Sequence, residues 1–96
     1  MKPSIVLDAH RGAIRRIVAS HRATNARVFG SVVHGEDVEG SDLDILIDPT
    51  SETSLMDVAK IQVELERLLG VRVDVLTPRA LPEKILDQIL AETVPV

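Results

Sequence analysis

The stretch of sequence that decides the fold runs from Val28 to Asp48 and reads VFGSVVHGEDVEGSDLDILID. An apolar segment ends at Gly30-Ser31, and after a gap of ten residues a second apolar segment begins with two acids separated by one leucine. Short apolar segments bounded by glycine and polar residues are typical of β-strands. We therefore predict strands at residues 26–30 and 42–48, joined by a turn.

Four more segments surround this pair. Apolar residues at helical spacing predict helices over residues 7–22, over 54–69 and after the Pro78–Pro82 stretch, and alternating valines predict a third strand over 71–76. The second helix has clear limits, because Ser54 and Asp57 form a capping-box-like start and Gly70 is a natural stop. We predict an α/β (α+β) fold, with a small mixed sheet of three to four strands flanked by helices in one domain, residues 1–96.

Composition excludes several classes of function. Fifteen acids against 11 bases give a net charge of −4, and Phe29 is the only aromatic residue, so a nucleic-acid-binding surface is not expected. No apolar stretch is long enough to span a bilayer, and the start has no signal-peptide pattern. The chain has no cysteine, which excludes disulfides and thiolate metal sites and suits a reducing cytoplasm.

The acid pair is the first candidate for chemistry. Side chains on a strand alternate between faces, so Leu43 and Ile45 point into the core while Asp42 and Asp44 lie side by side on the other face. Adjacent carboxylates repel each other, and a divalent cation such as Mg²⁺ would relieve that repulsion. The alternative is two solvated acids on an exposed face.

A third acid, Asp74, lies on the polar face of the strand at 71–76. If this strand pairs beside the second strand with matching faces, three carboxylates could hold two metal ions. The alternative for Asp74 is an ion pair with a neighbouring arginine. Asp48 shares the face of the first two acids but lies further along, and we interpret it as a loop or capping acid.

Gly30-Ser31 is the second candidate. A glycine at a strand end lets the main chain approach a phosphate, and the Ser31 hydroxyl could donate to a phosphate oxygen. Gly35, four residues on, could belong to the same turn, and Ser41 either orients a carboxylate or shapes a turn. The simpler alternative for Gly30-Ser31 is an ordinary turn.

These motifs, Gly30-Ser31 and the acid pair that follows Gly40-Ser41, resemble the signature of the polymerase-beta-like nucleotidyltransferase superfamily. The chain is similar in particular to its minimal nucleotidyltransferases, the MntA-type antitoxins encoded beside HEPN-domain toxins. The resemblance covers nearly the whole chain, including the strand with the third acid and the tail at residues 89–96.

The resemblance implies a nucleotidyltransferase palm fold and transfer of AMP from ATP to a tyrosine of a HEPN-type toxin. Gly30 and Ser31 would hold the triphosphate, with Gly35 and Ser41 as further nucleotide-binding candidates. The catalytic and metal-binding residues would be Asp42, Asp44 and Asp74, holding two Mg²⁺ ions. Many relatives carry an arginine where this chain has His34, which is either a ligand contact or a turn residue.

A three-strand sheet with a metal site offers no walls for a base or an acceptor, so we expect a partner protein to complete the cleft. Two other functions remain open, namely an antitoxin that acts by masking alone and a small-molecule nucleotidyltransferase of the antibiotic-resistance kind. On the first helix, Arg11, Arg15 and Arg22 fall on one face, which we interpret as solvated surface. His10 and His21 are either a pH-sensitive surface pair or, as we expect, isolated surface histidines.

Overall fold

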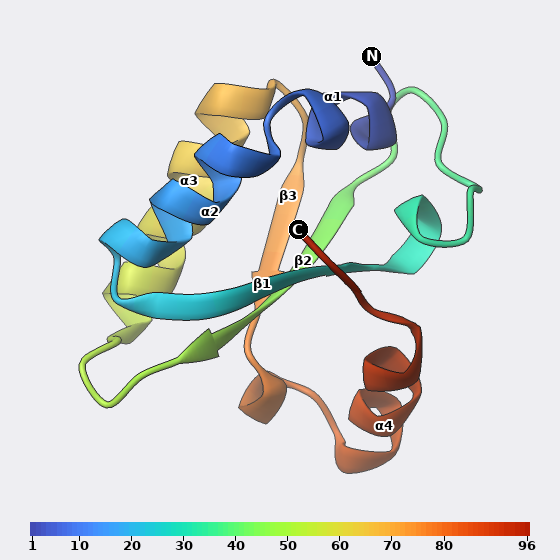
Figure 1. Ribbon diagram of the computed structural model, residues 1–96. Coiled ribbons are helices and arrows are strands. Elements are labelled where there is room, and N and C mark those ends of the chain that lie inside the picture. The colour runs from blue at the N-terminus through green and yellow to red at the C-terminus, as the bar shows by residue number, and fades with distance from the viewer.

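The computed structural model describes residues 1–96 and contains a four-stranded sheet with helices on both sides (Figure 1). The elements in chain order are α1 (Pro3–Ala9), α2 (Arg11–Ser20), β1 (Ala23–Phe29), the 3-10 turn η1 (Gly30–Val32), β2 (Leu43–Pro49), α3 (Leu55–Leu69), β3 (Val73–Leu76), the 3-10 turn η2 (Pro78–Ala80), α4 (Glu83–Glu92) and β4 (Val94–Pro95).

The sheet is mixed, as the sequence predicts. Its strand order is β3-β2-β1-β4, with β1 antiparallel to both neighbours and β2 parallel to β3. Phe29 is paired with Asp44 across the first junction, and Asp44 is paired with Asp74 across the second. The end of β1 and the starts of β2 and β3 therefore meet at one end of the sheet.

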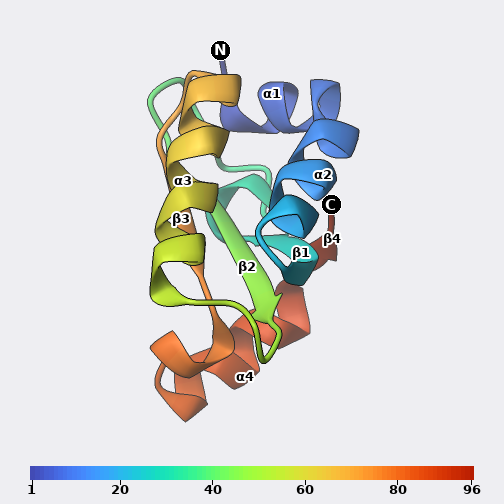
Figure 2. The same cartoon turned by 90° about the vertical axis from the view of Figure 1, so that its left-hand side faces the viewer.

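The core lies between the sheet and helices α1, α2 and α3, which share one side of it (Figure 2). From β2, the predicted inward residues Leu43, Ile45 and Ile47 are all 0% exposed. They pack in one cluster with side chains such as Ile14 of α2 and Ile61 of α3. Burial of each such side chain contributes about 1.5–3 kcal/mol, so the strand that carries the acid pair is firmly held.

The predicted helix at residues 7–22 is wrong as a single element. The main chain leaves the helical region at His10, with φ −131° and ψ 20°, and two helices result. The His10 ring nitrogen Nδ1 lies 3.0 Å from the carbonyl oxygen of Val6, and its own carbonyl accepts the first hydrogen bond of α2, from Ile14. His10 is thus a junction residue rather than an isolated surface histidine.

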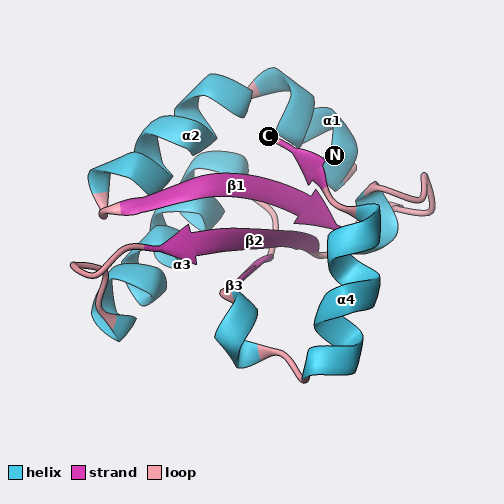
Figure 3. Ribbon diagram, turned by 60° about the horizontal axis from the view of Figure 1, so that its bottom comes forward, coloured by secondary structure: helices cyan, strands magenta, loops and turns pink.

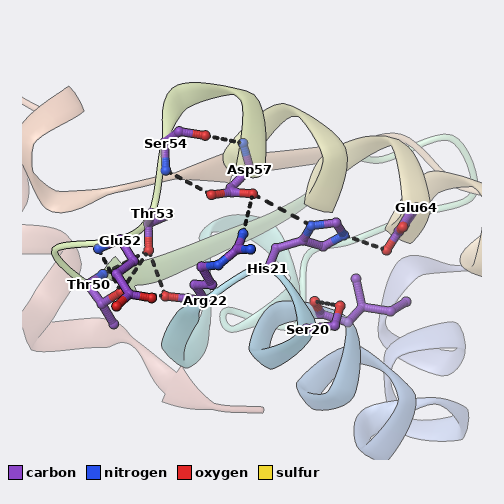
Figure 4. Close-up of polar contacts among 10 residues, drawn as sticks. Ser20, His21, Arg22, Thr50, Glu52, Thr53, Ser54, Asp57 and Glu64 are labelled. Carbon is purple, nitrogen blue, oxygen red and sulfur yellow. Dashed lines mark hydrogen bonds and ion pairs between the residues drawn. The ribbon is translucent and has the colours of Figure 1, made fainter.

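A polar network links the α2–β1 turn to the start of α3 (Figure 4). The capping box of Ser54 and Asp57 is present as predicted. Hydrogen bonding to the main-chain N–H of Ser54 is the main reason that the pKa of Asp57 lies below its usual value. Two predicted surface residues belong here instead, since Arg22 pairs with Asp57 at 3.5 Å and the His21 ring lies 3.0 Å from Glu64.

Two other predicted surface arginines hold the end of the chain. Arg11 donates to the main-chain oxygen of Pro95 at 3.1 Å, and Arg15 donates to that of Val96 at 2.6 Å. Both contacts tie the end of the chain to α2, beside the short strand β4, which pairs with the edge of β1 through Val28 and Val94. The sequence patterns indicated neither this strand nor the role of the arginines.

Helix α4 lies on the opposite side of the sheet from α2 and α3 (Figure 3). It has no buried residue, and Ile85 and Leu90 are close to half exposed. The only side-chain hydrogen bond or ion pair between α4 and a distant segment joins Glu92 to His34 of the turn after η1, at 3.0 Å. None of the helices combines the length and the apolar character needed to cross a bilayer.

Candidate active site

The three candidate acids lie together at the end of the sheet where β1 stops and β2 and β3 start. Asp44 and Asp74 occupy paired positions on adjacent parallel strands, and Asp42 comes one residue before β2. The carboxyl groups of Asp44 and Asp74 share a hydrogen bond, and the charge of Asp42 also acts on Asp44. All three side chains therefore point to the same side of the sheet.

Asp44 has the most perturbed carboxyl group of the cluster. Its pKa is raised to about 6, first by burial, then by the negative charges of Asp74 and Asp42, and by the hydrogen bond with Asp74. Each of these effects disfavours the charged form. A nearby positive charge would reverse that balance, so the site is electrostatically suited to a cation.

The glycine at the end of β1 lies against this cluster. Gly30 has a φ of +79°, and a Cβ built on it would collide with carboxylate oxygen Oδ2 of Asp44. Only glycine allows the turn to approach the acid so closely. The turn η1, which contains Ser31, is then closed by hydrogen bonds to the Gly30 carbonyl from the N–H groups of Val33 and His34, at 3.1 and 3.4 Å.

The residues present fit a hard divalent cation in part. No group of three histidine, cysteine or acidic side chains converges on a point that a metal ion could occupy. The hydrogen-bonded pair of Asp44 and Asp74 nevertheless offers oxygen donors from two carboxylates. Mg²⁺ commonly takes one or two carboxylates and completes its shell with water and phosphate oxygens. The two-ion site with Asp42 as a third ligand stays a prediction.

An arginine that the sequence reasoning missed borders the cluster. Arg72, just before β3, has its Nε 3.5 Å from Oδ1 of Asp42. An ion pair with an arginine was the alternative for Asp74, but Asp74 makes none, and Arg72 pairs with Asp42 instead. The available signal was a basic residue directly before the strand that carries the third acid.

The remaining candidates differ in their relation to the acids. The Ser41 hydroxyl accepts a hydrogen bond from the Val38 N–H at 2.9 Å, so Ser41 shapes a turn and does not orient a carboxylate. A Cβ on Gly35 would meet nothing within 4 Å, in contrast to Gly30. Asp48 lies apart from the cluster, where it pairs with Arg27 at 3.0 Å.

The acid cluster is an open surface rather than a pocket. The molecule has four cavities, and none is lined by any of the three acids or by Gly30-Ser31. One cavity of about 310 Å³ adjoins the cluster, with Ser41 and Arg72 among its lining residues. The chain therefore presents reactive groups without enclosing a substrate around them.

Comparison with known proteins agrees with this geometry. The family model for the nucleotidyltransferase domain matches residues 9–96. The chain is 37% identical to the protein adenylyltransferase MntA of Thermococcus cleftensis over 89 residues, which covers 93% of this chain and 87% of that protein. A Methanocaldococcus jannaschii protein assigned as a protein adenylyltransferase is 40% identical over 80 residues, covering 83% of this chain and 86% of that one.

Solved structures show the same fold. A structure assigned as a minimal nucleotidyltransferase superposes with a TM-score of 0.88 at 42% identity, covering 97% of this chain and 95% of that one. A chain from the complex of a tri-AMPylated Shewanella oneidensis HEPN toxin with an MNT antitoxin gives a TM-score of 0.69 at 14% identity, covering 92% and 69%, which supports the fold alone. This chain belongs to the nucleotidyltransferase domain family.

Proposed function

We propose that this chain is a metal-dependent protein adenylyltransferase that transfers AMP from ATP to a hydroxyl, that of a tyrosine, on a HEPN-type toxin and so acts as its antitoxin. The observation that carries the proposal is the placement of Asp42, Asp44 and Asp74 on one side of the sheet with Gly30 against them. The names of the relatives support it, since two of them are assigned as protein adenylyltransferases.

At the α-phosphorus the reaction forms one P–O bond and breaks another, and the acceptor hydroxyl loses its proton. The acceptor hydroxyl oxygen attacks the α-phosphorus of ATP, the bond to the β-phosphate oxygen breaks, and pyrophosphate leaves. A bound Mg²⁺ would neutralise phosphate charge and polarise the reacting oxygens. In this proposal Asp42, Asp44 and Asp74 hold the metal ions, and Gly30 and Ser31 position the triphosphate.

The acids differ in solvent exposure, and this difference suggests which acid accepts the proton and which one serves mainly as a metal ligand. Asp44 is half-buried beneath the turn, whereas Asp74 is exposed. An incoming acceptor therefore meets Asp74 first. We assign the proton of the acceptor hydroxyl to the Asp74 carboxylate, which leaves Asp44 as the inner ligand beside Gly30.

The open site supports the need for a partner. Because no cavity surrounds the acids, nothing in this chain encloses an acceptor or excludes water from the reacting atoms. A docked protein would supply the acceptor hydroxyl and the missing walls together. The solved complexes of a HEPN toxin with an MNT antitoxin, and of a toxin–antitoxin pair with AMP-PNP, are precedents among proteins of the same fold.

Mass spectrometry of the toxin tests the proposal. The product of the gene beside that of this protein is incubated with the protein, ATP and Mg²⁺, all of which are cytoplasmic in our proposal. We expect a mass increase of one or more AMP units, mapped to a tyrosine and lost with EDTA or with Asp42→Asn or Asp44→Asn. Asp87→Asn is the matched control, because Asp87 is exposed and makes no ion pair.

The same samples separate this function from the binding-only alternative. If the Asp42→Asn and Asp44→Asn proteins neutralise the toxin fully and no mass increase occurs with the wild type, masking alone explains the antitoxin role. Transfer of AMP to small alcohols by this chain without its partner would contradict the requirement for a docked protein.

A further inference from the structure

Arg72 combines an anchored main chain with a solvent-exposed side chain. Its carbonyl oxygen accepts a hydrogen bond from the N–H of Leu43 at 2.9 Å, which ties it to the start of β2. Its side chain, by contrast, is 81% exposed. The guanidinium group can therefore swing through solvent while its base stays beside the acid cluster.

In the structure this group rests on one of the candidate metal ligands. Arg72 Nε lies 3.5 Å from Asp42 Oδ1, and this is the only ion pair that any of the three acids makes. The Asp42 side chain is 34% exposed, so the pair is open to solvent. Exposed ion pairs of this kind contribute little and are easily exchanged for other contacts.

A metal ion on Asp42 would compete with Arg72 for the same carboxylate. The metal ion and the guanidinium would repel each other on the Asp42 carboxylate, and the exposed arginine side chain can move away. When Arg72 leaves Asp42, its anchored main chain keeps the guanidinium at this end of the sheet. The triphosphate, which carries the opposite charge, would lie at the same end under the proposed function, and a guanidinium matches phosphate oxygens in a two-pronged geometry.

We propose that Arg72 is a nucleotide-binding residue that exchanges Asp42 for the phosphates of ATP when the metal ion binds. This inference rests on the proposed function and adds a residue to its site. The exchange predicts two opposite effects, because loss of Arg72 should raise the affinity for the metal ion and lower the affinity for the nucleotide. A residue that only supports the fold would not affect the two ligands in opposite directions.

The test compares Arg72→Gln with the wild type by titration calorimetry. Mn²⁺ alone should bind about two- to fivefold more tightly to the variant, the gain expected when a weak competing ion pair is removed. AMP-PNP titrated in the presence of saturating Mn²⁺ should bind about tenfold or more weakly, as expected for a lost hydrogen bond to a charged group. Arg72→Lys keeps the positive charge but loses the two-pronged guanidinium geometry, so its affinity for AMP-PNP should lie between those of the wild type and Arg72→Gln.

Arg79→Gln is the matched control, because Arg79 is an exposed arginine in η2 with no ion pair, and it should change neither affinity. Circular dichroism confirms that each variant is folded. Unchanged or weaker Mn²⁺ binding, unchanged AMP-PNP binding, or no Mn²⁺ binding by either protein at millimolar metal overturns the inference. AMP transfer by the same wild-type sample is measured in parallel, so an active wild type with such results refutes only the role of Arg72, whereas an inactive wild type refutes the proposed function.

Discussion

Asp44→Asn should make the protein more stable while abolishing AMP transfer. The pKa of Asp44 is about 6 in the folded chain against an ordinary value of 3.8. At neutral pH Asp44 is ionised, and its charge therefore lowers the free energy of unfolding. A difference of about two in pKa corresponds to about 3 kcal/mol, and partial solvent exposure reduces the expected gain to about 2–3 kcal/mol. For a chain of this size, such a gain raises Tm by about 10 °C or more.

The sign of the pH dependence follows from the same two values. Because the folded-state pKa is raised, the folded chain binds the Asp44 proton more tightly than the unfolded chain does, and this group costs stability only where it is ionised. The cost is absent below the ordinary value of 3.8, grows as pH rises, and is complete above about 6. The stability advantage of Asp44→Asn should therefore be full at pH 8, about half as large at pH 5, and nearly absent below pH 4.

Urea unfolding in EDTA at these three pH values measures the effect. Asp87→Asn is the control, because it removes the same charge from an exposed helix position and should change stability little. Added Mg²⁺ should stabilise the wild type more than Asp44→Asn, since a ligand that binds the folded state raises its stability. The reasoning is refuted if Asp44→Asn is no more stable than the wild type at pH 8, or if its advantage does not shrink in acid.

Three further predictions concern other parts of the structure. Gly30→Ala should lose AMP transfer and at least about 1–2 kcal/mol of stability in urea unfolding, because the residue has a positive φ and its new Cβ would collide with Asp44. Gly40→Ala, the control, also has a positive φ but no collision and should keep its activity. Ser54→Ala should lose about 1 kcal/mol with the capping box, and an unchanged urea midpoint would contradict that assignment. Glu92→Ala, which removes the acceptor, should speed amide exchange in α4 and leave α3 unchanged, whereas equal protection in both proteins would mean that the contact with His34 does not hold the helix.

Local patterns predicted the parts of the fold that local sequence determines. The acid pair and the inward residues of β2 follow from strand alternation, and the limits of α3 follow from Ser54 and Gly70. The approach of Gly30 to the acids could be suspected from the motif, but the collision that makes glycine necessary depends on the pairing of Phe29 with Asp44.

The features that the sequence patterns did not predict also have physical reasons. Apolar periodicity continues from α1 into α2 and does not report the turn of the main chain at His10. The two-residue strand β4 exists because β1 has a free edge, which a short segment containing proline does not reveal. The partners of Arg22 and Arg72 lie on distant segments, so spacing along the chain could not identify them.

Under the proposed function, the open end of the sheet has a consequence for how the acceptor protein is selected. No cavity surrounds the acids, so under the proposed function they cannot select an acceptor by shape, and the choice of acceptor would depend on the protein that docks beside them. Acceptor choice can then drift by substitutions in the docking protein while β1, β2 and β3 stay as they are. For the same reason, a small inhibitor directed at the acids alone would bury little of its surface, and the interface between the two proteins would be a better target.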